Sequence, residues 1–271
     1  MQFNELKEIL ANKLSPKIFR LNSETYGLQY NRIRNNNIIK KVMLTIDLSL
    51  EAIHFAIKQR VGLIISHHSL IDKPIKKFNQ NIINKLSLLS KYPISIFILN
   101  SPFIAAEGGV SDTLANVLYL KIENTINVKE NNGIEVPIGR ICSPINYPNE
   151  KNPITFEDLI KRLKKNLNLS SVSYVGDLGR PIKKVCVIGG DILISKLIKK
   201  NLKLRCDCFI SVKFSYFDAV FARDIGLNLL ETPHYKIDNL AIKKLYNILS
   251  LEFPHSEFLL FESKDPYKTY I

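Results

Sequence analysis

Two adjacent histidines, His67 and His68, follow directly after the apolar run 62–66. A short apolar run of this kind predicts a buried strand. In an open parallel sheet, ligands bind just beyond the carboxyl ends of the strands. Two imidazoles at such an end therefore predict a metal site or a pair of acid–base groups. The alternative interpretation is one histidine in the core and one at the surface.

A histidine and a carboxylate, His234 and Asp238, lie four residues apart where a predicted strand gives way to a helix. If the helix has begun by His234, this spacing places both side chains on one helix face. Imidazole and carboxylate ligands together suit Zn, Fe, Mn or Co. The alternative is that Asp238 caps the last helix. The remaining histidines, His54 and His255, are interpreted as structural.

Alternating strands and helices must position these residues. Strands are expected at 41–48, 62–66 and 94–99, and helices at 1–14, 49–60, 78–91 and 111–119. Ser49 is the predicted N-cap of the second helix. This order is typical of a mainly parallel sheet with helices on its faces. We therefore predict an α/β fold whose first lobe spans residues 1–127 and carries the two adjacent histidines.

A second α/β lobe with its own mainly parallel sheet is expected at 128–271. Residues 128–143 predict a hairpin, because a turn signal separates two strand-like runs. Further strands are expected at 172–175, 184–188, 206–212, 228–230 and 257–262, and helices at 155–167, 192–200, 216–225 and 238–251. The C-terminal elements, from about residue 235 to 271, are candidates to pack back on the first lobe.

Two glycine pairs fall in predicted strand-to-helix turns. The pair at 189–190 lacks both the Rossmann and the P-loop spacing, so a tight turn is favoured over a phosphate site. The pair at 108–109 is followed by Ser111 and Asp112, which are interpreted as helix caps. Neither turn is expected to carry catalysis.

The net charge of +13 permits a polyanionic partner such as nucleic acid. The lysines are scattered over many elements, which favours a solvated basic surface. The chain has four cysteines and no C-x-x-C spacing, and packed thiols in a reducing compartment are favoured over a metal or redox pair. No signal peptide and no membrane-spanning run is apparent, so a cytoplasmic protein without membrane contact is expected.

An ordered set of motifs covers nearly the whole chain and resembles the Nif-three-like family, known as type 2 homologues of GTP cyclohydrolase 1. The segment SHHSLI at 66–71 is similar to the family's S-H-H-P-L-I/F, with Ser69 in the proline position. The other matching segments are YGLQ at 26–29, TIDLSLEAIHFAI at 45–57, AAEGGVSDTLANVLYL at 105–120, GRI at 139–141, YVGDLGRPIKKVCVIGGD at 174–191 and PHY at 233–235.

The resemblance implies two interlinked α/β lobes, a toroidal homohexamer and a paired-metal site. At the positions where the family has metal ligands, this chain has three histidines and one aspartate: His67, His68, His234 and Asp238. Asp238 is a shorter carboxylate in a glutamate position. Other positions depart from the family: its aspartate is replaced by Ile104, the histidine of A-H-T by Asn100, and the acid of T-G-E by Lys213.

The charges of the retained ligands bear on how many ions the site holds. Two divalent cations carry a total charge of +4, whereas three neutral imidazoles and one carboxylate together carry a charge of −1. Two cations about 4 Å apart repel strongly unless carboxylates or hydroxide bridge them. The prediction is therefore at most one divalent transition metal per chain, or none. Glu107, three residues past Ile104, is a candidate substitute ligand.

Three functions remain open from the sequence. The first is a metal-binding or scaffold member of the family with a weakened metal site. The second is a metal-dependent hydrolase of a nucleotide-like or phosphorylated, small anionic substrate, for which GTP cyclohydrolase activity is implied by the family label alone. The third is a nucleic-acid-associated oligomeric ring, suggested by the net charge.

Overall fold

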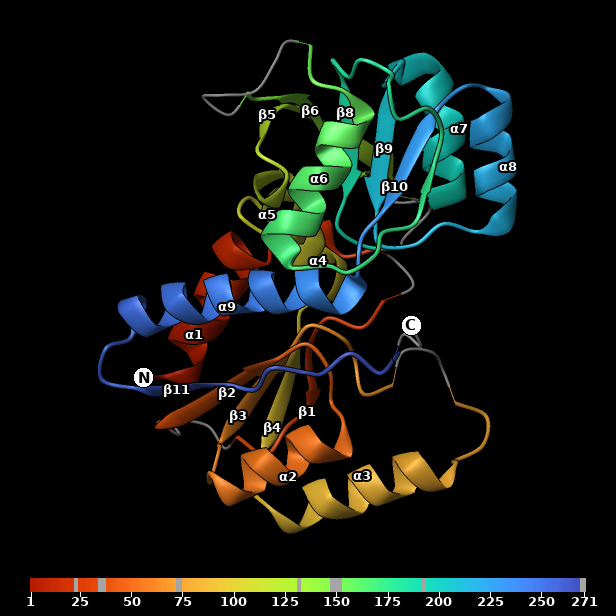
Figure 1. Cartoon of the computed structure of the whole chain (residues 1–271). Helices are drawn as coiled ribbons and strands as arrows, with labels where there is room; N and C mark the ends of the chain where they lie inside the picture. Colours follow the sequence, from red (N-terminus) through yellow and green to blue (C-terminus); the bar gives the residue numbers. More distant parts are fainter. Residues whose placement is uncertain are drawn as a thin grey trace. The chain divides into compact units, whose positions relative to one another are not determined.

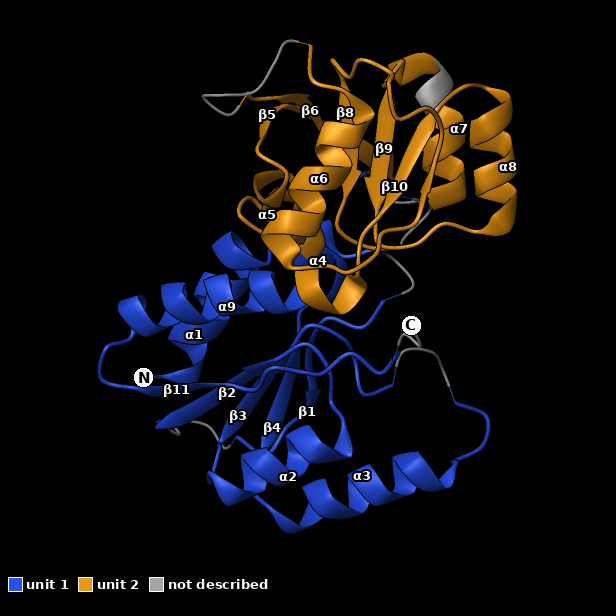
Figure 2. Cartoon of the chain, viewed as in Figure 1, with its two compact units in different colours: residues 1–103, 130–134, 238–271 blue, residues 104–129, 135–237 orange. Residues whose placement is uncertain are grey.

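The computed structural model describes residues 1–21, 24–33, 38–71, 75–130, 133–146, 153–191 and 194–268. The chain forms two compact units (Figure 2). Unit 1 consists of Met1–Phe103, Glu130–Ile134 and Asp238–Ile271, and unit 2 of Ile104–Lys129 and Glu135–Ile237. The boundary expected at residue 127 thus lies within unit 2, and the C-terminal segment from Asp238 belongs to unit 1.

Unit 1 is built on a five-stranded sheet with the order β1-β4-β3-β2-β11 (Figure 1). The strands are β1 (Gly27–Tyr30), β2 (Lys41–Thr45), β3 (Leu63–Ser66), β4 (Ser95–Ile98) and β11 (Glu257–Leu260). β1 is antiparallel to β4, and the other neighbours are parallel. This sheet is mainly parallel, as predicted. β1 was not expected as a strand, because its residues form no apolar run. In the structure all four of them are half-buried.

Helices cover both faces of this sheet. They are α1 (Phe3–Ile9), α2 (Leu50–Lys58) and α3 (Gln80–Lys91), with short helical turns at Leu10–Leu14 and Lys17–Phe19. Unit 1 also contains α4 (Asn100–Ala105) as far as Phe103 and α9 (His234–Glu252) from Asp238 onward. α2 and α3 lie on one face, and α1 and α9 on the other (Figure 1). Ser49 caps α2, as predicted, by accepting the backbone N–H of Ala52 at 3.0 Å.

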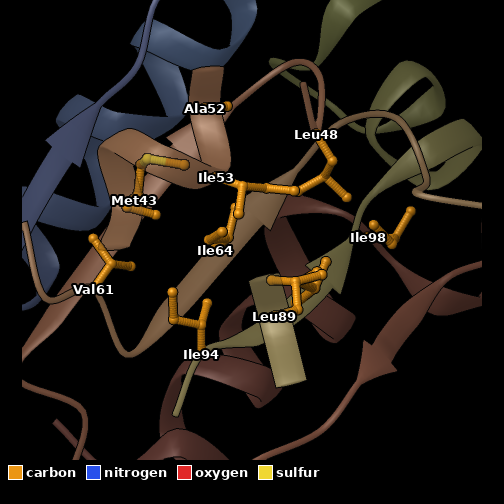
Figure 3. Packing of buried hydrophobic residues seen from close by; sticks show 11 residues of the cluster. Met43, Leu48, Ala52, Ile53, Val61, Ile64, Leu89, Ile94 and Ile98 are labelled. Carbon is orange, nitrogen blue, oxygen red and sulfur yellow. The ribbon is translucent and has the colours of Figure 1, made fainter. Parts of the chain in front are cut away.

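The core of unit 1 follows from the alternation of side chains along its strands. Met43 and Ile64 point toward α2 and α3, where Ile53 and Leu89 pack against them (Figure 3). The strand residues before and after Met43 and Ile64 face the other side, and all of them are buried. A strand buried on both faces reads as a continuous apolar run, which is why the sequence predicted these strands.

Unit 2 is built on a six-stranded sheet with the order β5-β6-β8-β9-β10-β7 (Figure 1). The strands are β5 (Leu120–Lys129), β6 (Glu135–Pro144), β7 (Tyr174–Val175), β8 (Val185–Ile188), β9 (Cys208–Ser211) and β10 (Asn228–Glu231). Only the β8–β9 and β9–β10 pairs are parallel. The expectation of a mainly parallel second sheet is wrong, because the β5–β6 hairpin and the edge strand β7 add antiparallel pairs.

The helices of unit 2 are α5 (Val110–Val117), α6 (Phe156–Leu167), α7 (Ile194–Leu204) and α8 (Tyr216–Asp224). α6 begins with a capping box between Thr155 and Asp158. Ser111 is not the predicted cap of α5: Gly109 occupies that position, and the Ser111 hydroxyl donates to the carbonyl of Ile138 at 2.8 Å. The predicted turn at 131–132 and helix start at 192–193 lie outside the described residues.

The glycine turn after β8 is explained by close packing. A side chain at Gly189 would meet the backbone of Val110 at 2.7 Å, and the Gly189 N–H donates to the Ser111 hydroxyl. Only a residue without Cβ fits such an approach. This agrees with the prediction of a tight turn.

The cysteines divide into two kinds. Cys142 and Cys208 are buried thiols, as predicted. Cys186 and Cys206 form a disulfide, so the expectation of packed thiols is wrong for this pair. Cys206 precedes β9, whereas the sequence placed it inside the strand. Within the described part of the chain, no helix has the length and apolar character needed to cross a membrane.

Candidate metal centre

Three side chains of unit 1 converge at one end of its sheet: His67, His68 and Asp238. Each offers one ligand atom, and these atoms all lie within 4.8 Å of one another. His67 Nε2 lies 3.8 Å from Asp238 Oδ1, and His68 Nε2 lies 3.5 Å from Asp238 Oδ2. The imidazole rings of His67 and His68 are 4.5 Å apart between centroids.

The two histidines are held by the extension of β3 beyond its last residue. The backbone N–H groups of His67 and His68 donate to the carbonyls of Thr45 and Ile46, at 3.0 and 2.8 Å. The Ser66 hydroxyl donates to the His68 carbonyl at 2.7 Å. The segment therefore continues the β2–β3 register, and its side chains emerge at the carboxyl end of a parallel strand, as the sequence predicted.

The loop after His68 is braced by Gln29 on β1. The Gln29 side-chain amide accepts the backbone N–H of Leu70 at 2.8 Å and donates to the carbonyl of Ile71 at 2.9 Å. Gln29 belongs to the YGLQ segment that carried part of the family resemblance. Its role in supporting the histidine loop was not predicted, because the two segments are 41 residues apart.

Asp238 lies in α9, which begins at His234 rather than at residue 238. The interpretation of Asp238 as a helix cap is therefore wrong, because Asp238 lies one turn inside the helix. It shares the buried face of α9 with Ala241, Ile242 and Leu245. Asn239 anchors the same turn by donating to the carbonyl of Ser263 at 2.9 Å.

The carboxylate of Asp238 and the ring of His67 are almost completely buried, with side-chain exposures of 0% and 1%. A buried carboxylate costs free energy unless positive charge neutralises it. Either a protonated imidazole or a cation can provide that charge. Phe103 packs its ring edge-on against His67, with 5.6 Å between centroids, and excludes water from that side.

His68 is more exposed and has a second carboxylate partner. Its side chain is 36% exposed, and its Nδ1 lies 2.8 Å from Asp47 Oδ1, at the end of β2. Asp47 was not predicted as a site residue, although it lies in a segment that matches the family. Lys85 of α3 is also within electrostatic range: burial lowers its pKa, and the negative charge of Asp47 partly opposes this shift.

The two remaining residues predicted as ligands, His234 and Glu107, belong to unit 2. His234 is the first residue of α9 and is half-buried, one helical turn before Asp238. Glu107 is exposed and Ile104 is buried. Asn100, in the family's histidine position, donates its side-chain amide to the carbonyl of Thr25 at 2.6 Å, which gives it a structural role. Among the described residues, the cluster of potential ligands in unit 1 has three members.

The geometry of the cluster suits one ion. Ligand atoms arranged tetrahedrally at about 2.0–2.2 Å from a metal are roughly 3.3–3.6 Å apart. His67 Nε2 lies 3.8 Å from Oδ1 of Asp238 and His68 Nε2 lies 3.5 Å from Oδ2, so each imidazole is near this spacing from one oxygen of the carboxylate. Two histidines and one carboxylate are a ligand set that Zn and Fe accept, with further positions open.

The fold and the cluster define a two-unit α/β protein with two histidines and an aspartate at the carboxyl end of its central parallel strand. The chain belongs to the Duf34/NIF3 (NGG1p interacting factor 3) family, whose model matches residues 1–266. The resemblance found in the sequence is thereby confirmed.

Two curated relatives that align over most of this chain are distant in sequence. A GTP cyclohydrolase 1 type 2 homolog of Clostridium perfringens is 25% identical over 272 residues, covering 99% of both chains. A protein of the same name from Streptococcus pneumoniae is 29% identical over 87% of this chain and 85% of its own. The crystal structure of a hypothetical protein of Staphylococcus aureus superposes with a TM-score of 0.82 at 21% identity, covering 100% of this chain and 99% of the other, and this confirms the fold.

Proposed function

We propose that this chain is a metal-binding member of its family that holds one divalent transition-metal ion through His67, His68 and Asp238. The observation that carries the proposal is the donor set, two imidazoles and a carboxylate with ligand atoms within 4.8 Å of one another. Zn, Fe, Mn and Co all accept such a set. A bound cation would supply positive charge to the buried Asp238 carboxylate.

One ion is favoured over two because the cluster contains a single carboxylate. Neutral imidazoles contribute no charge, so one divalent ion leaves a net charge of +1 and two would leave +3. A close pair of cations needs bridging carboxylates or hydroxide to offset its repulsion. The position at which the family has a further aspartate is Ile104, whose side chain offers no ligand atom.

The proposal is tested by metal content per chain, measured by mass spectrometry of gently purified protein. About one ion per chain is expected for the wild type, and a large loss is expected for Asp238→Asn and His67→Ala. His54→Ala is the matched control, because His54 is an exposed histidine on α2 of the same unit. Two tightly bound ions per chain would contradict the single-ion site, and none would contradict metal binding.

Two further residues remain predicted metal ligands, and each is tested by a substitution of its own. His234 is predicted to contribute because it precedes Asp238 by one helical turn. Glu107 is predicted as a substitute for the missing aspartate. His234→Ala and Glu107→Gln should each weaken metal affinity if these residues are ligands. Unchanged affinity in either variant would remove that residue from the site.

A second candidate function is metal-dependent hydrolysis of a small anionic, phosphorylated substrate. The observation that favours it is that three protein ligands leave coordination positions open, as in catalytic metal sites. A bound divalent ion supplies Lewis-acid polarisation of a phosphoryl or carbonyl oxygen. Turnover of nucleotides by the wild type that is lost in Asp238→Asn would support it. Absence of turnover in metal-loaded protein would leave the scaffold function as the better account.

The assembly state is proposed from the family resemblance. A homohexamer of this 31.0 kDa chain would have a mass of about six times that value, which light scattering coupled to gel filtration distinguishes readily from a monomer or dimer. A monomeric mass at micromolar concentration would contradict the hexamer without affecting the metal proposal.

A further inference from the structure

We propose that Asp47 is a positioning residue that fixes the tautomer and orientation of His68, so that Nε2 of this ring is the metal-binding atom. This inference builds on the proposed metal function. Asp47 itself is not assigned as a ligand, because the cluster of ligand atoms consists of His67, His68 and Asp238.

The two ring nitrogens of His68 face different carboxylates. Nδ1 lies 2.8 Å from Asp47 Oδ1, a normal hydrogen-bond distance, whereas Nε2 lies 3.5 Å from Asp238 Oδ2. A carboxylate can only accept a hydrogen bond, so the Asp47 contact places the hydrogen on Nδ1. In the neutral ring, Nε2 then carries the lone pair, and it does so on the side where Asp238 lies. A metal-binding histidine commonly has its second nitrogen oriented in this way.

His68 needs such a restraint more than its neighbour does. The His67 ring is 1% exposed and packs against Phe103, so its surroundings already limit its rotation. The His68 side chain is 36% exposed, and burial alone leaves it more rotational freedom. The hydrogen bond to Asp47 therefore supplies an orientation that packing does not.

Asp47 is itself held by a short connection between β2 and α2. The Thr45 hydroxyl donates to the Asp47 carbonyl at 3.2 Å. The next residue, Leu48, is buried in the core of unit 1, and Ser49 caps α2. A carboxylate on a connection this short is fixed to two regular elements, which is the arrangement expected of a residue that supports a ligand.

The β2–β3 register brings the two side chains together. Thr45 pairs with Ser66, and the backbone bonds from His67 to Thr45 and from His68 to Ile46 continue the ladder beyond both strands. Asp47 thus follows β2 at the level where His68 follows β3. The contact between the Asp47 and His68 side chains therefore depends on the register of β2 and β3, and not on any local motif.

The first test is the tautomer of His68 in metal-free wild-type protein, read from the 15N chemical shifts of its ring at a pH where the ring is neutral. The Nδ1–H form is expected. An Nε2–H form would overturn the inference outright. This measurement requires no variant and no metal, so it remains decisive even if the metal proposal fails.

The second test compares the affinity for Zn²⁺ alone in Asp47→Ala, Asp47→Asn and the wild type. Loss of such a partner typically weakens metal binding about 10- to 100-fold, and this is the effect expected for Asp47→Ala. Asp47→Asn keeps an acceptor oxygen and should retain part of the affinity and the Nδ1–H tautomer. Glu51→Gln is the matched control, because Glu51 is an exposed carboxylate on α2 of the same unit. Its Zn²⁺ affinity is expected to equal that of the wild type.

The outcomes separate the two proposals. Zn²⁺ affinity equal to the wild type in a folded Asp47→Ala protein would overturn the positioning role while leaving the metal site intact. Failure of the wild type to bind Zn²⁺, together with an Nδ1–H His68, would contradict the proposed function and keep the Asp47–His68 orientation. Thermal unfolding of each variant identifies any loss of affinity that comes from loss of fold.

Discussion

Gln29 accepts the backbone N–H of Leu70 through its side-chain oxygen at 2.8 Å, while its side-chain nitrogen donates to the carbonyl of Ile71 at 2.9 Å. One amide group thus satisfies two backbone groups of the loop that follows His68. A backbone polar group left without a partner costs free energy, so the amide both stabilises the loop and fixes its path.

Gln29→Leu is expected to remove both hydrogen bonds and loosen the histidine loop. Each bond contributes about 0.5–1.5 kcal/mol, so a loss of about 1–3 kcal/mol in the free energy of unfolding is expected. Faster amide exchange at Leu70 should accompany it, measured by hydrogen–deuterium exchange. Gln80→Leu, at an exposed position on α3, is the control. Unchanged exchange at Leu70 would show that the amide does not restrain the loop.

A buried ion pair stabilises unit 2. Arg140 Nε lies 2.5 Å from Asp112 Oδ1, and the same guanidinium donates to the carbonyls of Ala105, Ala106 and Pro137. The side chains are 5% and 11% exposed. The sequence interpretation of Asp112 as a cap is only part of its role: its second oxygen accepts the N–H of Gly108, but its first pairs with the arginine.

Asp112→Ala should destabilise the chain by about 3–5 kcal/mol, because it leaves a buried guanidinium without its counter-charge. The free energy of unfolding from urea denaturation measures this effect. Glu157→Gln removes one partner of an exposed ion pair with Lys161 and should cost less than about 0.5 kcal/mol. If the free energy of unfolding of Asp112→Ala falls by less than about 1 kcal/mol, water solvates the Arg140 guanidinium in place of Asp112.

Most elements could be predicted because their signals are local. Buried strands such as β3 and β4 are continuous apolar runs, and caps such as Ser49 and Thr155 lie next to the helices that they begin. α4 (Asn100–Ala105) was not among the expected helices. It begins at Asn100, two residues after the last residue of β4, and its six residues are too few to show a helical periodicity.

The site could be predicted only where its residues carry their own signal. His67, His68 and Asp238 are residue types that bind metals, and the position of the two histidines at a strand end was predicted. The last helix was expected to begin at residue 238, whereas it begins at His234. Asp47 and Gln29 act through contacts 21 and 41 residues away along the chain. Such contacts depend on strand order and register, which composition and periodicity leave undetermined.

The thiols offer a test of the cysteine pairing. Cys186 and Cys206 form a disulfide, so denatured, unreduced protein should show two reactive thiols per chain and reduced protein four. In the folded chain, burial raises the pKa of Cys142 to about 12 and also raises that of Cys208, so both should react slowly with Ellman's reagent at pH 8. Cys142→Ser should lower the unreduced count to one. Four thiols without reductant would contradict the disulfide.

The charge of Asp47 should be detectable at a second residue, Lys85. Burial lowers the pKa of Lys85 by disfavouring the ammonium form, and the negative charge of Asp47 favours that form and raises the pKa. Asp47→Asn removes the raising influence, so Lys85 should lose its proton at a lower pH than in the wild type.

An NMR titration that follows the side-chain resonances of Lys85 measures this shift, and it requires no bound metal. Glu51→Gln, which neutralises an exposed carboxylate paired with Lys264, is the control and should change the Lys85 titration much less. A Lys85 pKa that is unchanged or raised in Asp47→Asn would show that the Asp47 carboxylate does not stabilise the ammonium form of Lys85. That result would also weaken its assignment as the charged partner of His68, because both effects require a carboxylate at the same position.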